Sequence, residues 1–341
     1  MQQRTFYLDN VCALLIIHMI FVCHQPLFCN YSSPSIDFCL KLLSFFMAWF
    51  FFKAGMVFKD RPTKDVVRSS FRRLLVPYFA FSLIGIAIMG LQQYVLGHNP
   101  FSLWFLKYEF NWLLENSTFF PTQACWFLLS LFIVRVVYSS IHKKKLAPPI
   151  AIVAVSIALG WLIYEFFVKD NSCYTLAVLN SHYKIHVPFY IGNMFHGLAF
   201  YTLGYWLKDK QFNRYLLVIA LSLFVLKFFF FAFMDFRGNN TDGGNYLLCI
   251  AYELSGCIVV NNVFRKWVNR EIPLLSHIGR NSMVYYLVHY PLMTFIVMFL
   301  NPFPGYTNSV RYILLSVILI LLLVISDYIF RIKRLKPFIG G

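Results

Sequence analysis

Residues 7–29 read YLDNVCALLIIHMIFVCHQPLFC, and this stretch decides the fold class. A run of about 20 predominantly apolar residues is long enough to cross a hydrocarbon core of roughly 30 Å as a helix. The stretch carries Asp9, His18 and His24, and no small-residue cleavage site follows it, which is unlike a removable signal peptide. The sequence therefore predicts that this segment stays in the mature protein as a transmembrane helix.

Similar apolar runs recur along the whole chain. Hydrophobic residues make up 59% of the 341 residues and charged residues only 13%, whereas about a quarter of a soluble domain is charged. The runs are too long and too uniform for the alternating strands of a membrane barrel, so they predict helices. The predicted spans are residues 7–29, 37–58, 74–96, 122–141, 148–168, 186–207, 215–235, 246–264, 278–300 and 311–330. The expected fold is an all-α, polytopic membrane protein of about ten helices, with residues 1–341 forming one domain and no appended soluble domain.

Lysine and arginine are divided unevenly between the loops that alternate across the membrane. If the N-terminus is cytoplasmic, the outer segments hold only Lys107, Lys169, Lys184, Arg237 and Arg311. The inner segments hold Arg4; Lys59, Arg61, Lys64, Arg68, Arg72, Arg73; Lys143, Lys144, Lys145; Lys208, Lys210, Arg214; Arg265, Lys266, Arg270; and Arg331, Lys333, Arg334, Lys336. Because cytoplasmic loops carry an excess of these residues, both ends are predicted to be cytoplasmic.

The positive-inside loops also account for the net charge of +16 without a nucleic-acid partner. A basic cytoplasmic face suits, in addition, a polyanionic donor such as a nucleotide-bearing coenzyme. The sequence has no GxxxxGK phosphate loop, no GxSxG elbow and no HExxH helix. Its eight cysteines form no CxxC pair and no metal-ligand spacing with histidine, so no metal site is predicted.

Two polar residues of the first span share one helical face. At about 100° per residue, Asp9 and His24 are roughly 60° apart, whereas His18 lies about 180° from Asp9. At about 1.5 Å per residue, His24 lies roughly 22 Å beyond Asp9, toward the outer side. An imidazole there can act as a general base on a hydroxyl that arrives from outside. The alternative is a histidine bonded to a backbone carbonyl or a lipid headgroup.

Six blocks of the sequence together resemble the membrane acyltransferase-3 family, in the family's order and over almost the whole chain. They are YLDNVCALLIIHMIFVCH (7–24), FFMAWFFFKAGMVFK (45–59), FRRLLVPYF (71–79), ACWFLLSLFIVR (124–135), FYTLGYWLK (200–208) and IGRNSMVYYLVHYPLM (278–293). The resemblance implies a ten-helix domain in a bacterial cytoplasmic membrane. It implies transfer of an acyl group, usually acetyl, from cytoplasmic acyl-coenzyme A to a sugar hydroxyl of a surface polysaccharide or other glycan outside.

The resemblance also implies roles for residues of the first helix. The family carries an Asp, a Lys or Arg three residues later, and a catalytic His eleven residues after that cation. Asp9 matches the Asp, and His24 is the best match for the His, one residue beyond the family spacing. Cys12 occupies the place of the cation, so the charge must come from a neighbouring helix, the donor must be held differently, or activity is reduced.

A basic cluster precedes the third span and forms the expected donor site. Arg72 and Arg73, with Lys64 and Arg68 before them, can pair with the phosphates of coenzyme A, because guanidinium forks suit phosphate oxygens. Lys53 in the second span, or Arg72, could replace the cation missing at Cys12. The alternative for the cluster is an ordinary positive-inside anchor at lipid phosphates.

The expected acceptor site draws on the last block. Asn281, Ser282, Tyr285, Tyr286 and His289 form a polar stripe on one helix, which in lipid must face protein or a cavity. Tyr285, Tyr286, Ser282 and Asn281 are therefore candidates for substrate binding, and His289 for catalysis. Interhelical contacts are the structural alternative for each.

Three further features complete the predicted site. Trp126 begins the fourth span at the outer boundary, where it could stack on a carbohydrate or belong to an aromatic belt. The aromatic segment 91–123 is a candidate re-entrant lid over the acceptor. Glu253, the most deeply placed carboxylate, is a catalytic candidate that could orient an imidazole or pair with Lys53 or Arg135.

Two other classes of function stay open at this stage. A transporter of a glycan or small anion would use Glu253, His196 and His289 along its path, although no internal repeat supports that reading. A non-catalytic descendant of an acyltransferase is suggested by Cys12. The glycan, the acyl group and the oligomeric state cannot be deduced from the residues.

Overall fold

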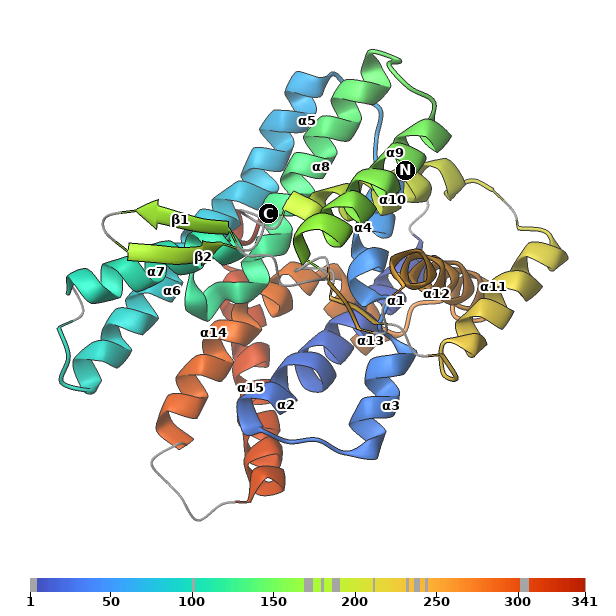
Figure 1. Cartoon of the computed structure of the whole chain (residues 1–341). Coiled ribbons are helices and arrows are strands. Elements are labelled where there is room, and N and C mark those ends of the chain that lie inside the picture. Colours follow the sequence, from blue (N-terminus) through green and yellow to red (C-terminus); the bar gives the residue numbers. More distant parts are fainter. Residues whose placement is uncertain are drawn as a thin grey trace.

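Helices carry the fold of the computed structural model (Figure 1). The structure describes residues 5–99, 102–168, 174–178, 181–185, 191–210, 212–230, 233–235, 240–242, 245–300 and 307–340. Two short antiparallel hairpins, β1 (Tyr174–Val178) with β2 (Ser181–Ile185) and β3 (Phe233–Asp235) with β4 (Asn240–Asp242), are additions that the hydropathy pattern did not predict.

The helical elements follow one another in this order along the chain. They are α1 (Phe6–His18), the π-helical turn η1 (Met19–His24), α2 (Gln25–Cys29), α3 (Pro34–Leu42), α4 (Phe46–Met56), α5 (Thr63–Ser70), the π-helical turn η2 (Phe71–Leu75), α6 (Val76–Val95), α7 (Leu103–Asn116), the 3-10 turn η3 (Phe120–Cys125), α8 (Trp126–Lys143), α9 (Pro149–Ile163), the π-helical turn η4 (Tyr164–Val168), α10 (Ile191–Leu207), α11 (Arg214–Leu226), α12 (Tyr246–Trp267), α13 (Pro273–Arg280), α14 (Ser282–Leu300), α15 (Asn308–Phe330) and the 3-10 turn η6 (Lys336–Ile339).

Seven helical stretches in the described part of the chain are long and apolar enough to cross a membrane. They are Phe6–Cys29, Pro34–Met56, Thr63–Val95, Thr122–Lys143, Pro149–Phe166, Tyr246–Trp267 and Asn308–Phe330. Each corresponds to one of the ten predicted spans. The protein is therefore a helical membrane protein, and the total of ten spans remains a prediction.

The other three predicted spans correspond to shorter helices. In the predicted span 186–207, helix α10 is described from Ile191, and residues 186–190 lie outside the described residues. The predicted span 215–235 is too long, because α11 ends at Leu226, and the next residue, Lys227, donates from its ammonium to the Leu42 carbonyl at 2.8 Å. The predicted span 278–300 is broken at Asn281, which separates α13 from α14.

Glycines let α4 and α10 pack backbone to backbone at the centre of the molecule. A Cβ added to Gly55 would overlap the Tyr201 carbonyl, and one added to Gly204 would overlap the Phe52 carbonyl. Small residues at such contacts are how membrane helices approach closely without a hydrophobic driving force. This contact also buries the Phe51 ring against Gly197, while the buried Trp49 indole donates to Asn261 of α12 at 3.0 Å.

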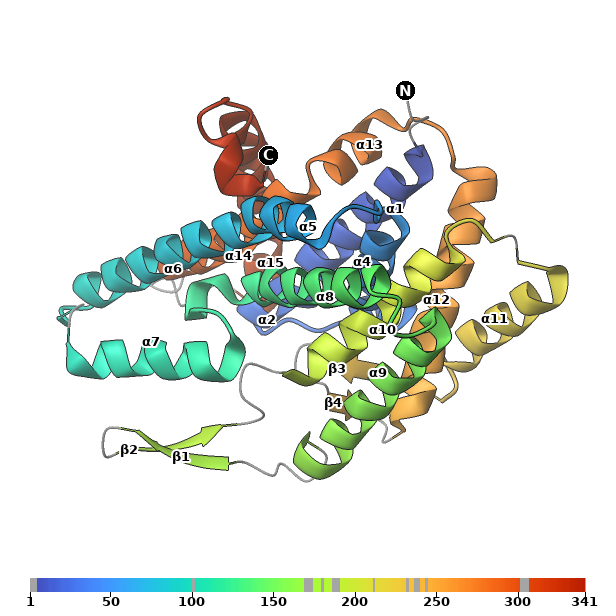
Figure 2. The ribbon, with the colours of Figure 1, turned by 90° about the horizontal axis from the view of Figure 1, so that it is seen from above.

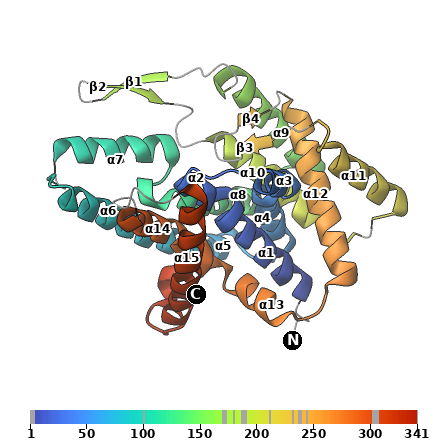
Figure 3. The same cartoon turned by 90° about the horizontal axis from the view of Figure 1, so that it is seen from below.

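The two ends of the described chain lie on the same face of the molecule (Figures 2 and 3). The start of α1, the short helix α13 and the C-terminal turn η6 are all at this face, and the β1–β2 hairpin lies on the opposite one. Helix α7 lies in the middle of the aromatic segment 91–123, with stacked rings of Trp104, Tyr108 and Trp112 along one side. Whether α7 acts as a lid stays a prediction.

Candidate active site

A π-helical turn lies immediately before the predicted catalytic histidine. Helix α1 runs into the turn Met19–His24 and continues as α2. A π-turn bonds residue i to i+5, so it takes up about one residue more than an α-helical turn. Asp9 and His24 are then separated by about fourteen α-helical steps and lie roughly 40° apart. The turn thus compensates for the extra residue by which His24 departs from the family spacing.

Helix α15 holds this π-turn in place. The Gln25 amide, which is fully buried, donates to the Tyr312 carbonyl at 2.7 Å and to the Ser316 hydroxyl at 2.6 Å. The Tyr312 hydroxyl in turn donates to the Phe21 carbonyl at 2.8 Å. The sequence analysis missed these residues, although a glutamine inside an apolar span next to His24 was a signal for a polar interhelical contact.

His24 and His289 form a hydrogen-bonded imidazole pair. His24 Nδ1 lies 2.8 Å from His289 Nε2, and the two rings are nearly parallel, at 3°. His289 is completely buried, whereas His24 is partly exposed. The Tyr290 ring packs edge-on against His24, with centroids 5.5 Å apart. The structure therefore brings together two of the four predicted catalytic residues, from helices at opposite ends of the sequence.

The backbone of α14 fixes the proton positions in this pair. His289 Nδ1 lies 2.8 Å from the Tyr286 carbonyl and 3.1 Å from that of Tyr285, so Nδ1 carries the proton and donates. His289 Nε2 must then accept the proton of His24 Nδ1–H, which leaves the lone pair of a neutral His24 on Nε2. His24 is thus oriented with its basic nitrogen directed away from His289.

Asn10, the neighbour of Asp9, fixes the start of α1 by hydrogen bonds to residues around α13. The Asn10 amide, fully buried, donates to the carbonyls of Val268 and Arg270, each at 3.0 Å, and accepts from the Ser276 hydroxyl at 3.0 Å. Asp9 lies at the contact with α13, where its carbonyl meets Gly279. Asp9 is not brought to the imidazole pair, because fifteen residues of helix separate it from His24.

A basic cavity of about 630 Å³ is lined by residues of α1, α4, α8, α14 and α15 and of the turns η2 and η6. Cys12 is in its wall. Its cations are Lys53, Arg73, Arg135, Arg280, Arg331 and Lys336, and Asp327 is the carboxylate among the lining residues. The apolar part of its lining includes Phe50, Phe127, Leu131 and Val284. Such a cavity concentrates anions, because a cleft lined mainly by positive charges focuses their electric field.

Four of these cations are available to a ligand. Arg280 is paired with Glu271 at 2.7 Å, and Arg331 with Asp327 at 2.6 Å, a hydrogen bond that raises the pKa of Arg331. Lys53, Arg73, Arg135 and Lys336 have no ion-pair partner within the described residues. Unpaired guanidinium and ammonium groups are suited to phosphate oxygens.

The predicted donor cluster is only partly at this cavity. Lys53 and Arg73 line it, but Arg72, Arg68 and Lys64 are not among the lining residues. Adjacent residues of a helix point in different directions, which is consistent with Arg73 lining the cavity while Arg72 does not. The structure supplies Arg135, Arg280, Arg331 and Lys336, which the sequence analysis did not assign to a donor.

The predicted acceptor stripe on α14 is divided between two places. Asn281 and Ser282 line the basic cavity. Tyr285 and Tyr286 are buried, and the Tyr286 hydroxyl donates to the Ala124 carbonyl. Trp126 is also buried, with 6% of its surface exposed, so in this conformation it packs inside the bundle and presents little surface to a sugar.

Glu253 lies apart from the imidazole pair. It is buried in α12, and the charge acting on it is that of Lys227, at the end of α11. Lys53 and Arg135, the partners considered from the sequence, face the basic cavity instead. Glu253 is therefore placed in a different polar cluster from His24.

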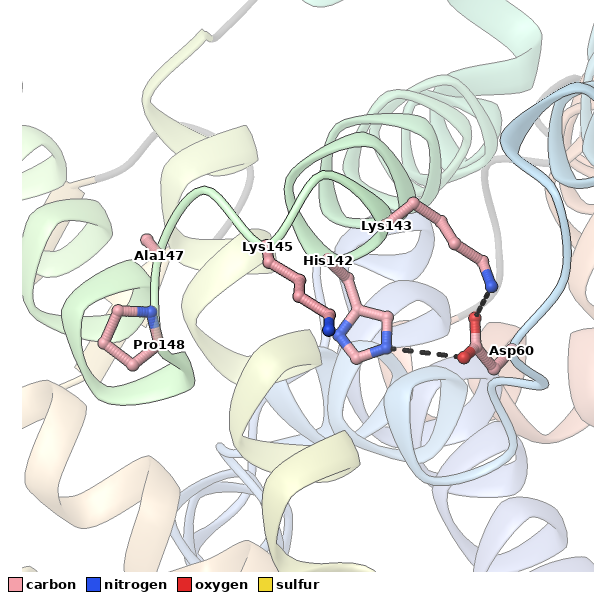
Figure 4. Close-up of a pocket in the computed structure, with 6 residues that line it drawn as sticks. All are labelled: Asp60, His142, Lys143, Lys145, Ala147 and Pro148. Carbon is pink, nitrogen blue, oxygen red and sulfur yellow. Dashed lines mark ion pairs between the residues drawn. The ribbon is translucent and has the colours of Figure 1, made fainter.

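A second, smaller pocket of about 370 Å³ lies near the turn between α8 and α9 (Figure 4). Asp60 accepts from Lys143 at 2.6 Å and lies 3.8 Å from His142. The hydrogen bond from Lys143 lowers the pKa of Asp60. Because its carboxylate already neutralises a lysine, this pocket is a weaker attractor for anions than the basic cavity.

Fold and site define a helical membrane protein with a basic cavity and a hydrogen-bonded imidazole pair. The chain belongs to the acyltransferase-3 family: the family model, described as an acyltransferase domain, matches residues 6–328. The resemblance seen in the sequence is thereby confirmed. Comparisons with curated proteins and with solved structures gave no match.

Proposed function

We propose that the protein transfers an acyl group, most simply acetyl, from cytoplasmic acyl-coenzyme A to a hydroxyl of an extracytoplasmic sugar. The observation that carries the proposal is the His24–His289 hydrogen bond, which is backed by the α14 carbonyls and oriented by them. Within a family of acyltransferases, an imidazole held in one tautomer is suited to act as a general base.

The proposed reaction uses the imidazole pair as a proton acceptor and donor. His24 Nε2 takes the proton of the acceptor hydroxyl as the hydroxyl oxygen bonds to the thioester carbonyl carbon. The C–S bond then breaks, and the departing thiolate of coenzyme A recovers a proton from the His24 imidazolium. His289 Nε2 keeps its hydrogen bond to His24 Nδ1–H throughout, which stabilises the transient positive charge.

The basic cavity supports the donor half of the proposal. Val284 at its apolar end lies five residues before His289 on α14, which is about 7.5 Å along the helix. Phosphates held by Lys53, Arg73 and Arg135 would leave a flexible thioester arm extending through the apolar part toward the imidazoles. The donor would thus bind at one side of the membrane and react nearer the other.

The proposed orientation has both ends of the chain in a bacterial cytoplasm and the acceptor outside. The loop charges favour that direction. It is also supported by the common face of α1's start, α13 and η6, opposite the β1–β2 hairpin (Figure 2). The glycan of a cell envelope is the acceptor class that fits a hydroxyl arriving from outside.

The test is acetyl transfer by purified protein from acetyl-coenzyme A to extracted surface glycan. We expect His24→Ala to lower the rate by about 10²- to 10⁴-fold, the usual contribution of a general base. His18→Ala is the matched control, because His18 is an imidazole of the same helix that contacts Cys23 rather than His289. If His24→Ala stays fully active while wild type turns over, the proposed role of His24 is refuted.

Transport without acyl chemistry is the competing function. His196, which would belong to such a path, binds the Tyr246 hydroxyl at 3.2 Å, and neither His196 nor Glu253 lines the two cavities described above. Movement of glycan across vesicles without acetylation would favour transport over the proposed transfer.

A further inference from the structure

We propose that the segment Arg331–Gly340, after the last long helix, binds the phosphates of the acyl donor through Lys336. This segment would supply the positive charge that Cys12 does not provide from the first helix. The inference rests on the proposed function, since it assigns part of the donor site. The family match ends at residue 328, so this feature belongs to the chain's own C-terminal segment.

The segment forms one wall of the basic cavity. Helix α15 ends at Phe330, and the chain turns back through the 3-10 turn Lys336–Ile339. Lys336, Ile339 and Gly340 line the cavity together with Arg73 and Cys12. A cation at position 336 and the side chain at position 12 therefore face the same space, although they are far apart in the sequence.

Two attachments hold the segment against the bundle. At its start, Asp327 accepts from Arg331 at 2.6 Å and from His277 Nε2 at 2.8 Å, which ties α15 to α13. At its end, Gly340 packs on the Arg73 carbonyl with a φ of 79°, in the left-handed region that glycine adopts without a steric cost. The position of Lys336 is thus defined by contacts on both sides of it.

Charge pairing distinguishes Lys336 from its neighbour Arg331. Arg331 is neutralised by Asp327, so its main effect is to hold the segment. Lys336 has no ion-pair partner within the described residues and lies in the cavity wall. An unpaired ammonium in a cavity shared with Lys53, Arg73 and Arg135 is suited to a ligand that carries several phosphates.

The experiment compares Lys336→Gln with Lys333→Gln in the full-length protein. Lys333 is exposed on the same segment but does not line the cavity. We expect Lys336→Gln to raise the KM for acetyl-coenzyme A and the Kd for coenzyme A by about tenfold, as for one lost charge-assisted hydrogen bond. The kcat should change little, because Lys336 is remote from the imidazole pair, and Lys333→Gln should leave all three values unchanged.

A second variant tests whether Lys336 replaces the missing cation. Adding Cys12→Arg to Lys336→Gln should restore the Kd to within about threefold of wild type, since the arginine enters the same cavity. A double variant whose Kd stays as weak as that of Lys336→Gln would refute the idea that Lys336 replaces the cation missing at position 12. Equal weakening by the two lysine variants would show general surface electrostatics and overturn the assignment.

Equilibrium dialysis with coenzyme A separates this inference from the proposed function. Wild type that binds coenzyme A but acetylates no glycan would refute the transfer and still allow the role of Lys336 to be decided from Kd. Wild type that turns over with a Kd unaffected by Lys336→Gln would refute the inference alone. Wild type that does not bind coenzyme A would refute both.

Discussion

Two pairs of buried polar residues lie inside this bundle, and they differ in what surrounds them. His24 and His289 face each other in a direct hydrogen bond, and His24 keeps part of its surface exposed. Lys227 and Glu253 are both buried, and the Lys227 ammonium lies over the Phe224 ring, 4.2 Å from its centroid. The Leu42 carbonyl accepts one of its protons.

The difference separates a pair that a substrate can reach from an enclosed one. A general base needs an atom that a substrate can reach, which the partly exposed His24 offers and the enclosed Lys227 does not. A charged residue inside the membrane is a functional candidate by default. A charge such as that of Lys227, enclosed by aromatic rings and a carbonyl, can instead serve to hold helices together. Glu253, which lies apart from the imidazole pair, stays a catalytic prediction that the activity of its variants must test.

The largest expected effect comes from removing His289. His289→Leu should lower acetyl transfer by about 10²-fold or more, because His24 loses the acceptor that fixes its tautomer. The unfolding midpoint in detergent should fall only slightly, as for one net hydrogen bond of about 1 kcal/mol. Glu253→Gln is the matched change in the other pair and should retain near wild-type activity. Equal losses in the two variants would abolish the distinction between the pairs.

The second pair should contribute to stability. Lys227→Ala leaves the Leu42 carbonyl without its donor and removes the positive charge that acts on the buried Glu253, and an unsatisfied buried group costs about 1–3 kcal/mol. We expect a clearly lower unfolding midpoint in detergent, with the specific activity of the folded fraction unchanged. Replacing both members, Lys227→Met with Glu253→Leu, should recover most of the stability. Loss of activity in the folded Lys227→Ala protein would place this pair in the reaction after all.

Hydropathy and loop charge predicted the membrane class and seven of the spans, because the length of an apolar run is set by the bilayer. The length of the α11 span was overestimated, because the apolar and aromatic residues after Leu226 continue the hydropathy pattern although the helix ends there. The residues of the first span also predicted His24 as a candidate catalytic residue. Its partner His289 was found as part of a polar stripe, but no spacing rule could show that the two rings meet across 265 residues.

The cavity could not be predicted from the sequence, because its cations come from α4, η2, α8, α13 and the residues after α15. Single residues such as Arg135 and Lys336 carry no local motif. The facing of Arg73 rather than Arg72 depends on a π-helical turn, Phe71–Leu75, that no propensity indicates. Tertiary contacts, which bring these side chains together, are the information that one sequence lacks.

The smallest expected effect on stability is that of an exposed ion pair, Asp60 with Lys143. This pair serves as a comparison for the two buried pairs. Because the folded-state pKa of Asp60 is lowered, its contribution is present above the unfolded value, near 3.8, and is lost as the pH falls through the folded value. At pH 7 Asp60→Asn should cost at most about 1 kcal/mol, since exposed pairs are screened.

Thermal unfolding at pH 7 and at about pH 3.5 measures this cost, which should shrink at the lower pH. Lys143→Gln should reproduce it, and the double variant should add nothing further. A cost at pH 7 comparable to that of Lys227→Ala would mean that solvent exposure does not separate the two kinds of pair.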